Sequence, residues 1–404
     1  MVGSVQSTRR MIDPAERRAR LGVGHALAPD ARVATVADAA RAMTVLHATD
    51  AASVFLQARA RMRESSPHTI ERELYEGSTL LRHLAMRRTL FLVPIESVPI
   101  VHAAASVGVA AREIPRHLEM LAKAGFDADP AGHLAELETL ALAVIRDEGE
   151  IATAELRTRH PKLGEKLLFG RGTAYEREVS VAAEVVFLLA LSGRIGRGRP
   201  RGTWVSGQFR WSPIERWLPG GIPPMDVEEA QAELVRRWLR TFGPGTRDDI
   251  RWWTGWTVAA VRRALTTIGA VEVDLSDGTV GYVLSDDLEP AAVPPHWVAL
   301  LPALDATIMG WGPADRDWYL GPHRPRLFDT AGNAGPTIWV DGRVVGGWAQ
   351  RRDTGAVVPI LLEDVGAEIT AEIEAEAARL EAWIGPARVT GSFPTPLERQ
   401  HSGR

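Results

Sequence analysis

The sequence predicts an α+β chain that is mainly helical, with three tandem winged-helix units and a small β-barrel-like domain near its C-terminal end. Two observations lead to this fold class. Groups of segments with helical periodicity are each followed by a pair of β-rich segments, and this order occurs three times. Beyond Pro295, turn residues become frequent between short apolar runs, which is typical of a small barrel or sandwich.

The chain has 404 residues, which is too long for one compact core, so several structural units are expected. The segments 219–224 and 294–295 are rich in proline and glycine and are natural boundaries. The predicted order is a flexible tail at 1–14, a first winged-helix unit at 15–125, a second with a basic wing at 126–222, a third at 223–293, a β-barrel-like domain with a terminal helix at 294–393, and a tail at 394–404.

The first unit shows the winged-helix order most clearly. Thr35 can cap a helix in which Ala39, Met43 and Leu46 recur at helical spacing. Helices are predicted at 15–27, 34–46, 51–62 and 69–75, followed by two short strands within 80–94 that turn near Arg87 and Arg88. The second and third helices would form the helix-turn-helix, and the hairpin would form the wing.

The next two units repeat the pattern without a clear sequence period, so the repeat is one of architecture. In the second unit, helices are predicted at 134–146, 151–158 and 179–191, before a hairpin at 193–211 that is rich in glycine and arginine. In the third unit, helices are predicted at 229–242, 246–253 and 257–267, before a hairpin at 271–284. In the last domain, strands are predicted at 297–301, 337–340, 343–348 and 357–361, and a long amphipathic helix at 367–384.

Composition limits the classes of function. The chain has no cysteine, which excludes disulfides, thiol nucleophiles, iron–sulfur clusters and cysteine-ligated zinc. The eleven histidines are scattered singly, so neither a metal nor another cofactor is expected. No apolar stretch is long enough to cross a membrane, and the first ten residues lack a signal core, so a cytoplasmic protein is expected. The net charge of -4 does not by itself indicate a nucleic-acid-binding protein, so the distribution of charge along the chain is more informative than its sum.

The compact polar cluster of the first unit is His47-Ala48-Thr49-Asp50, at the joint between two predicted helices. A structural role is one interpretation, with Asp50 or Thr49 capping the following helix and His47 capping the preceding one. Catalysis is the other. Cleaving an N-glycosidic bond needs a water molecule under C1′, an acceptor for its proton and negative charge to stabilise an oxocarbenium ion. A histidine and a hydroxyl two residues apart can hold one water molecule, and the adjacent carboxylate can support them.

Arginines gather in two of the predicted wings. All but three of the 47 basic residues are arginine, which either reflects a GC-rich genome or serves phosphate binding. A solvated loop is the plain interpretation of the clusters, and contact with a phosphate backbone is the functional one. The residues predicted to contact DNA are Arg87 and Arg88 in the first wing, and Arg194, Arg197, Arg199, Arg201 and Trp204 in the second.

Several segments together resemble the AlkZ/YcaQ-type winged-helix DNA glycosylases of bacteria, and the resemblance covers about residues 17–383. The matching segments are Leu84-Ala-Met-Arg-Arg-Thr-Leu-Phe-Leu-Val-Pro94, Leu300-Leu-Pro-Ala-Leu-Asp305, Trp318-Tyr-Leu-Gly321 and Trp339-Val-Asp-Gly-Arg-Val-Val-Gly-Gly-Trp348. The resemblance implies three winged helices in a C-shape plus a small β-barrel. It also implies a monofunctional, metal-free enzyme that excises N-alkylated purines, and some family members unhook interstrand crosslinks.

The family's catalytic motif is Gln-x-Gln or Gln-x-Asp, and the matching positions here are His47 and Thr49. This departure keeps a pair that can hold water but changes both of its members. In the enzyme that the resemblance implies, His47 positions or deprotonates water, Thr49 shares that water, and Asp50 supports the site electrostatically. The expected partner is double-stranded DNA with alkylated bases, bound by a monomer associated with the nucleoid and acting in base excision repair.

Two alternatives from other classes remain at this stage. Tandem winged helices alone would predict a non-catalytic DNA-binding protein, such as a regulator or damage sensor. Such regulators are usually shorter dimers, and the extra β-rich domain has no obvious use in them. The other alternative is an intact fold that recruits repair proteins after losing its activity. The sequence does not name the lesion, nor does it decide between general repair and self-resistance.

Overall fold

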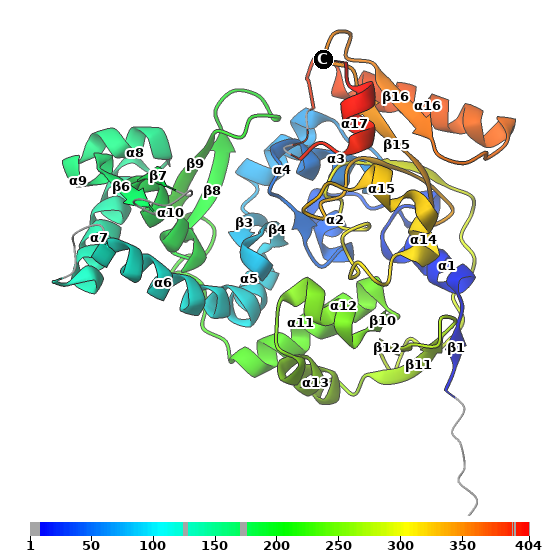
Figure 1. Cartoon of the computed structure of the whole chain (residues 1–404), viewed down its shortest axis with the longest axis horizontal. Helices are drawn as coiled ribbons and strands as arrows, with labels where there is room; N and C mark the ends of the chain where they lie inside the picture. Colours follow the sequence, from blue (N-terminus) through cyan, green and yellow to red (C-terminus); the bar gives the residue numbers. More distant parts are fainter. Residues whose placement is uncertain (1–8, 124–127, 170–175, 390, 392, 404) are drawn as a thin grey trace, which may run out of the picture. The chain divides into compact units, whose positions relative to one another are not determined.

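The computed structural model describes residues 9–123, 128–169, 176–389, 391 and 393–403. By internal contacts, the chain divides into two compact units, one of residues 1–70 with 231–404 and the other of residues 71–230. Helices and several small sheets give an α+β fold, as the sequence predicts (Figure 1). Among the described residues, no helix is both long and apolar enough to cross a membrane.

The first unit begins with three helices, α1 (Pro14–Gly24), α2 (Val36–Ala42) and α3 (Ala51–Arg61). Thr35 caps α2 as predicted, because its hydroxyl accepts the Asp38 N–H at 3.0 Å. The helix is shorter than the predicted span of 34–46. It ends at Ala42, and Thr44 takes a left-handed φ of 64° that turns the chain into strand β2 (Leu46–His47).

Further along the chain, the same unit contains a second group of helices and a hairpin. Helices α11 (Val227–Phe242), α12 (Arg247–Thr254) and α13 (Val258–Thr267) precede strands β11 (Val271–Leu275) and β12 (Val280–Val283), in the predicted order. Strands β10 (Gly245–Thr246) and β1 (Met11–Ile12) extend the hairpin to a sheet of order β1-β11-β12-β10. Thr246 and Asp249 form a capping box at the start of α12, and Gly255, with φ of 74°, ends it.

The C-terminal sheet is open, whereas the sequence analysis expected a barrel-like domain. Its strands are β13 (Val298–Leu301), β14 (Thr337–Val340), β15 (Arg343–Gln350) and β16 (Val357–Leu361), all antiparallel in chain order. Helix α16 (Ala367–Ile384) packs against both edge strands, β13 and β16, so a helix covers the sheet where barrel closure was expected. The short helices α14 (Asp317–Leu320) and α15 (Arg324–Leu327) lie in the β13–β14 connection.

The expected tail at 394–404 is also corrected. Residues Pro396–His401 form helix α17, which packs against β15. Its start is fixed by a capping box between Thr395 and Glu398, and Leu397 is fully buried. The chain end is therefore part of the first unit's packed structure up to this helix.

The second unit combines a sheet with a helical layer. Its sheet runs in the order β4-β3-β8-β9-β5, formed by β3 (Leu80–Leu84), β4 (Leu90–Pro94), β5 (Ile151–Ala152), β8 (Ile195–Pro200) and β9 (Phe209–Pro213). Its longer helices are α6 (Val107–Leu121), α7 (Pro130–Glu148), α8 (Thr153–Arg159) and α10 (Val181–Leu191). A core of leucines, isoleucines and valines from these helices packs against Trp211 on β9.

Two parts of this unit have no counterpart in the sequence prediction. Helix α5 (Val98–Val101) continues through a π-helical turn at His102–Ser106 into α6. A short helix, α9 (Pro161–Gly164), and a hairpin of β6 (Lys166–Phe169) and β7 (Arg177–Ser180) precede α10. The predicted helix at 179–191 therefore begins two residues later, at Val181. These insertions make the second helix–hairpin group longer than the other two.

Candidate functional site

The polar turn of residues 47–50 joins β2 to α3 in the first unit. Leu46 and Ala48 are fully buried, whereas His47 is half-buried and Thr49 is exposed. Only Leu46 and His47 belong to β2, and the chain bends at Thr49 and Asp50. His47 and Thr49 thus both keep part of their surface accessible, on either side of the buried Ala48.

The residues of the turn do not take the helix-capping role that the sequence left open. Helix α2 ends with Met43 as its C-cap, four residues before His47. Asp50 occupies the N-cap position of α3, but its side chain makes no capping hydrogen bond to that helix. The polar character of the turn is thus not explained by helix capping.

A buried amide on α3 fixes the turn from behind. The Nε2 of Gln57 donates to the His47 carbonyl oxygen at 2.8 Å and to the Ser53 carbonyl oxygen at 3.2 Å. Its Oε1 accepts the Ala306 N–H at 3.1 Å. Gln57 is fully buried, so these bonds form in a low dielectric, where leaving one unmade would be costly. One side chain thereby ties the backbone of the turn to both α3 and the loop after β13.

The same loop is bound to α3 by an ion pair that is completely buried. Both terminal nitrogens of Arg61 donate to the carboxylate oxygens of Asp305, at 2.8 and 2.9 Å, and each residue is 0% exposed. One nitrogen also donates to the Thr307 hydroxyl at 2.9 Å, and the other to the Gln57 carbonyl oxygen at 3.0 Å. This two-pronged geometry pairs the two charges directly, although the Nε of Arg61 is buried without a hydrogen-bond partner.

His25 extends this network toward α11. Its Nε2 donates to the Thr241 carbonyl oxygen at 3.1 Å, so its Nδ1 accepts the Thr307 hydroxyl proton at 3.0 Å. Burial and the nearby Arg61 charge lower the pKa of His25 to about 3. His25 is therefore neutral at physiological pH, and it joins three segments of the first unit behind the turn.

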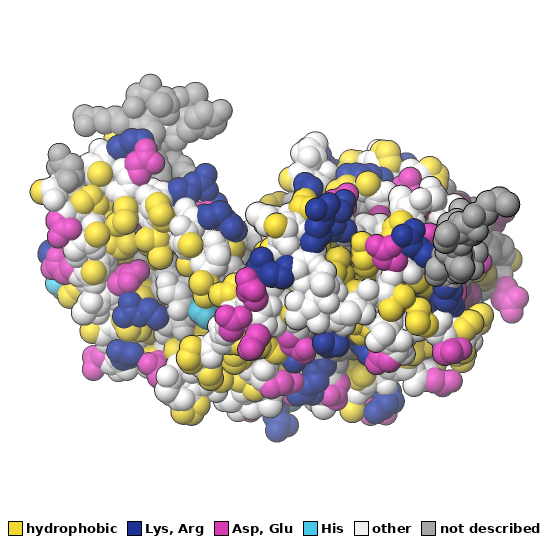
Figure 2. Space-filling view, turned by 90° about the horizontal axis from the view of Figure 1, so that it is seen from below, with side chains coloured by type: hydrophobic (Ala, Val, Ile, Leu, Met, Phe, Trp, Pro, Cys, Tyr) yellow, Lys and Arg dark blue, Asp and Glu magenta, His cyan; other side chains and the backbone are white. Residues whose placement is uncertain are grey.

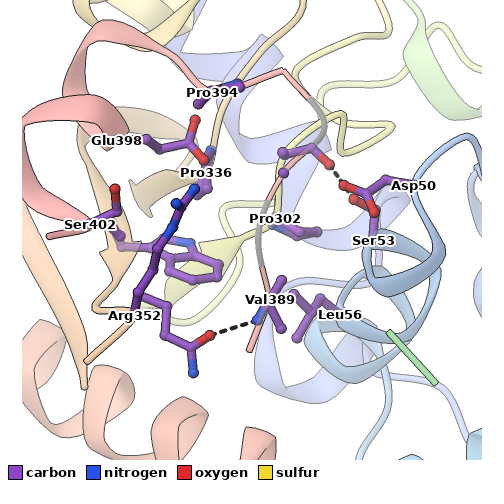
Figure 3. A pocket seen from close by; sticks show the side chains of 15 residues that line it. Asp50, Ser53, Leu56, Pro302, Pro336, Arg352, Val389, Pro394, Glu398 and Ser402 are labelled. Carbon is purple, nitrogen blue, oxygen red and sulfur yellow. Dashed lines mark hydrogen bonds between the residues drawn. The ribbon is translucent and has the colours of Figure 1, made fainter. Parts of the chain in front are cut away.

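A cavity opens beside Asp50, on the side of the turn toward the C-terminal sheet (Figure 3). Asp50, Ser53 and Leu56 of the turn and α3 line one side, and Glu398 of α17 faces them across it. Burial raises the pKa of Glu398, and the Asp50 charge adds to that rise. The cavity lining includes neither His47 nor Thr49, so Asp50 is the residue that connects this cavity to the turn.

The residues predicted to contact DNA fall into two groups. Arg87 and Arg88 are exposed at the β3–β4 turn, where both adopt left-handed φ angles of 53° and 63°. Arg88 lies 3.4 Å from the Glu113 carboxylate. In the second wing, Arg194 pairs with Glu138 at 3.0 Å, Arg199 with Glu76 at 2.9 Å, and Arg201 with Glu155, while Trp204 is half-buried.

Arg197 is half-buried, and its guanidinium packs against aromatic rings. Its guanidinium lies 5.0 Å from the ring centre of Trp211 and 5.2 Å from that of Phe209. Burial, together with the charge of Arg82 on the neighbouring strand, lowers the pKa of Arg197 to about 10. In this structure the Arg197 side chain packs on these rings of the sheet, and its contact with phosphate stays a prediction.

Carboxylates accompany arginines on other surfaces too, as the face in Figure 2 shows, where dark blue and magenta side chains lie close together.

Within the described residues, no group of three or more His, Asp or Glu side chains is arranged to hold a metal ion.

The sequence profile described as DNA glycosylase AlkZ-like matches residues 40–383, which include the polar turn and most of the described fold. The match places the chain in a class of proteins described as DNA glycosylases. The chain belongs to the AlkZ-like DNA glycosylase family.

Two comparisons support this assignment. The chain is 25% identical over 307 residues to the interstrand DNA cross-link repair glycosylase of Streptomyces sahachiroi, a stretch that covers 71% of this chain and 75% of that protein. The solved structure of the DNA glycosylase AlkZ from the same species is similar, with a TM-score of 0.67 at 20% identity, covering 91% of this chain and 96% of that one. At 20% identity, the structural similarity supports the fold alone.

Sequence reasoning missed Gln57, Arg61 and His25, which hold the turn. A basic residue and an amide inside a helix carry no pattern that distinguishes them from surface residues. The available signal was Asp305, at the end of one of the segments that carried the resemblance, because a lone aspartate between apolar residues needs a buried partner.

The buried ion pair makes a testable prediction about stability. Replacing Arg61 with Met leaves Asp305 as an uncompensated buried charge, so the free energy of unfolding should fall by about 3–5 kcal/mol. Urea denaturation monitored by tryptophan fluorescence measures this loss. The matched control is Arg41→Met, which breaks the exposed pair with Asp38 and should cost less than about 1 kcal/mol. Equal losses in the two variants would contradict the structural role assigned to Arg61.

The low pKa of His25 makes a second prediction, about pH. The unfolded chain binds a proton on His25 below its ordinary pKa of 6.5, whereas the folded chain does so only near 3. His25 therefore makes the protein less stable as the pH falls through this window, by about 2 kcal/mol between pH 6.5 and 5.

The matched variant is His25→Gln, and the quantity to compare is the change in unfolding free energy between pH 7 and pH 5. Asp249, whose pKa burial raises to about 7, contributes with the opposite sign, so only the difference between wild type and variant is informative. The variant should lose about 2 kcal/mol less than wild type on acidification. Identical pH profiles would show that His25 titrates normally.

Proposed function

We propose that this chain is a monofunctional DNA glycosylase that hydrolyses the N-glycosidic bond of N7- or N3-alkylated purines in duplex DNA. It would act in base excision repair, and its substrates would include purines held in interstrand crosslinks. The observation that carries the proposal is that His47 and Thr49 both remain accessible on either side of the buried Ala48, on a turn that caps neither neighbouring helix through a side chain.

The proposed hydrolysis follows from the types of residue at the turn. A water oxygen forms the new bond to C1′ of the sugar, and the bond from C1′ to the purine nitrogen breaks with its electron pair moving to the base. The imidazole of His47 accepts the proton that the water loses, while the Thr49 hydroxyl holds the water in place. The Asp50 carboxylate stabilises the positive charge that develops on the sugar.

The leaving group explains why a histidine and a threonine can suffice to cleave the N-glycosidic bond. An N-alkylated purine is already cationic, so it departs without being protonated by the enzyme. The demand on the site is reduced to holding and deprotonating one water molecule next to a carboxylate. The backbone of the turn is fixed by Gln57, which supports the precise placement that such a site needs.

Release of 7-methylguanine from alkylated duplex tests the catalytic role. His47→Ala should lower the single-turnover rate by at least about 100-fold, because it removes the proton acceptor. Duplex affinity should change little, since this role of His47 involves no contact with the phosphate backbone. His68→Ala, which removes an exposed histidine from α4 (Pro67–Glu76), is the matched control and should keep the wild-type rate.

The same assay decides between the proposal and the non-catalytic alternative. If the wild type binds alkylated duplex but releases no base, the chain is a DNA-binding protein without this activity. If His47→Ala releases base at the wild-type rate, the polar turn is not the catalytic site.

The exposed wing arginines make a prediction about DNA binding. Replacing both Arg87 and Arg88 with Gln removes two phosphate contacts, so the slope of log K against log salt should become shallower by about 2. Fluorescence anisotropy with a labelled duplex at several salt concentrations measures this slope. Arg379→Gln, on the exposed face of α16, is the control and should leave it unchanged.

Arg197→Gln separates packing from phosphate contact in the second wing. Because Arg197 is buried against Phe209 and Trp211, this variant should be less stable and should keep the wild-type salt slope. A shallower slope in a fully folded Arg197→Gln protein would restore its predicted role in DNA contact.

A further inference from the structure

A histidine joins the helices α6 and α10 in the second unit, and no step of the proposed reaction uses it. The Nε2 of His117 on α6 lies 2.6 Å from a carboxylate oxygen of Glu184 on α10. Its Nδ1 lies 2.8 Å from the Glu113 carbonyl oxygen, one turn earlier on α6. The side chains of His117 and Glu184 are 11% and 23% exposed, so the solvent screens their contact only in part.

Both neighbours of the His117 ring are hydrogen-bond acceptors, and this fixes the protonation state of the ring. A carbonyl oxygen and a carboxylate oxygen only accept, so each ring nitrogen has to carry a hydrogen. A neutral imidazole carries one hydrogen and would point a lone pair at one of the two oxygens. The two contacts therefore require the imidazolium, and His117 and Glu184 form a charged pair.

The charged groups around His117 favour the imidazolium. Burial alone would lower the pKa of His117, but the hydrogen bond to Glu184 and the charge of Glu113 raise this pKa above its ordinary value of 6.5. Arg88 and Arg116 are both paired with the Glu113 carboxylate. The small apolar cavity beside the pair, lined from α6, α7, β6 and α10, adds no other ionisable group among the described residues. Glu184 is thus the main group that holds the proton on the ring.

The same contacts reach Arg88, one of the two exposed arginines of the first wing. The Phe187 ring, one turn after Glu184 on α10, is stacked on the His117 ring with their centres 5.7 Å apart. The Arg88 guanidinium lies 5.5 Å from the centre of the same Phe187 ring and 3.4 Å from the Glu113 carboxylate. Arg88 therefore contacts both α6 and α10, and the His117–Glu184 pair joins these two helices beside it.

We propose that the His117–Glu184 pair is a pH-sensitive clamp that holds Arg88 of the wing in place for duplex binding. When the ring loses its proton, the charge attraction and one hydrogen bond are lost together, and a lone pair faces an oxygen at short range. Because folding raises the pKa of His117, the contribution of the pair is complete below pH 6.5 and is lost as the pH rises through the pKa of the folded state. Duplex affinity then falls, and this last step rests on the proposed DNA-binding role of Arg88.

The clamp itself is tested without DNA, by NMR titration of the histidine rings in the full chain. The His117 signal, assigned as the one that is missing from His117→Gln, should titrate above pH 6.5 in wild type. In Glu184→Gln it should titrate at a lower pH, because the carboxylate that holds the proton is gone while burial still disfavours the charge. A wild-type titration at or below pH 6.5, or an unchanged titration in Glu184→Gln, would overturn the proposal.

Fluorescence anisotropy with a labelled duplex measures the effect on binding at about pH 6 and about pH 9, at constant ionic strength. Other histidines titrate over this range, so the informative quantity is the difference between wild type and His117→Arg, whose guanidinium stays charged at both values. The loss of affinity on raising the pH should be at least about threefold larger in wild type than in this variant. His68→Gln, which removes an exposed histidine from α4, is the matched control and should follow wild type.

Equal losses of affinity in wild type and a folded His117→Arg protein would overturn the proposal, because the pair would then not act on the wing. Absence of duplex binding in every variant would overturn it through the DNA-binding role, and the NMR titration would still show whether the pair holds its proton. The two failures are thereby told apart.

A double variant connects the clamp to the wing. In an Arg88→Gln background, His117→Arg should no longer change the pH dependence of duplex affinity, because the side chain that the clamp holds is absent. A difference that persists in full in this background would assign the effect to another surface and overturn the proposal.

Discussion

The buried ion pair between Arg61 and Asp305 is the constraint on which the rest of the first unit depends. A guanidinium and a carboxylate removed from water are costly to bury, and the cost is offset by good pairing geometry and by further hydrogen bonds. Here the further acceptors for the two terminal nitrogens of Arg61 are the Thr307 hydroxyl and the Gln57 carbonyl oxygen. The pair therefore specifies how the C-terminal end of α3 meets the loop after β13.

The Arg61–Asp305 ion pair also helps to fix the geometry of the polar turn. Gln57 lies one turn before Arg61 on α3, so the helix that the ion pair holds also carries the amide that binds the His47 carbonyl oxygen. His25, kept neutral by burial, closes the network through Thr307. A hydrolytic site gains from such an arrangement, because the rate depends on a water molecule being held within a fraction of an ångström of its attack position.

The sequence predicted the parts of this fold that depend on local periodicity. The helix at 367–384 has the predicted bounds, and the hairpin at 80–94 turns at Arg87 and Arg88 as expected. The order of helices and hairpins also follows the predicted pattern, since apolar spacing and turn residues act over a few positions.

What the sequence did not predict depends on distant partners. The open sheet of β13 to β16 arises because α16 covers it, and α17 forms because Leu397 finds a buried place against β15. Arg197 looked like an exposed wing residue, but its neighbours across the sheet, Arg82 and Trp211, are far away in sequence. The choice of His47 and Thr49 followed from the polar cluster and from the resemblance, whereas the support of the turn by Gln57 and Arg61 required the tertiary contacts.

The proposed reaction poses an electrostatic problem. A purine alkylated on its ring carries a positive charge, while the backbone to which it is attached is negative. A protein that handles both must separate arginines from carboxylates over short distances, since a uniformly basic surface would repel the lesion. In the proposed scheme the exposed Arg87 and Arg88 would contact the backbone, and Asp50 at the turn would supply the opposite sign near the cationic base. A net charge of -4 is compatible with this scheme, because the distribution of charge matters more for DNA binding than its sum.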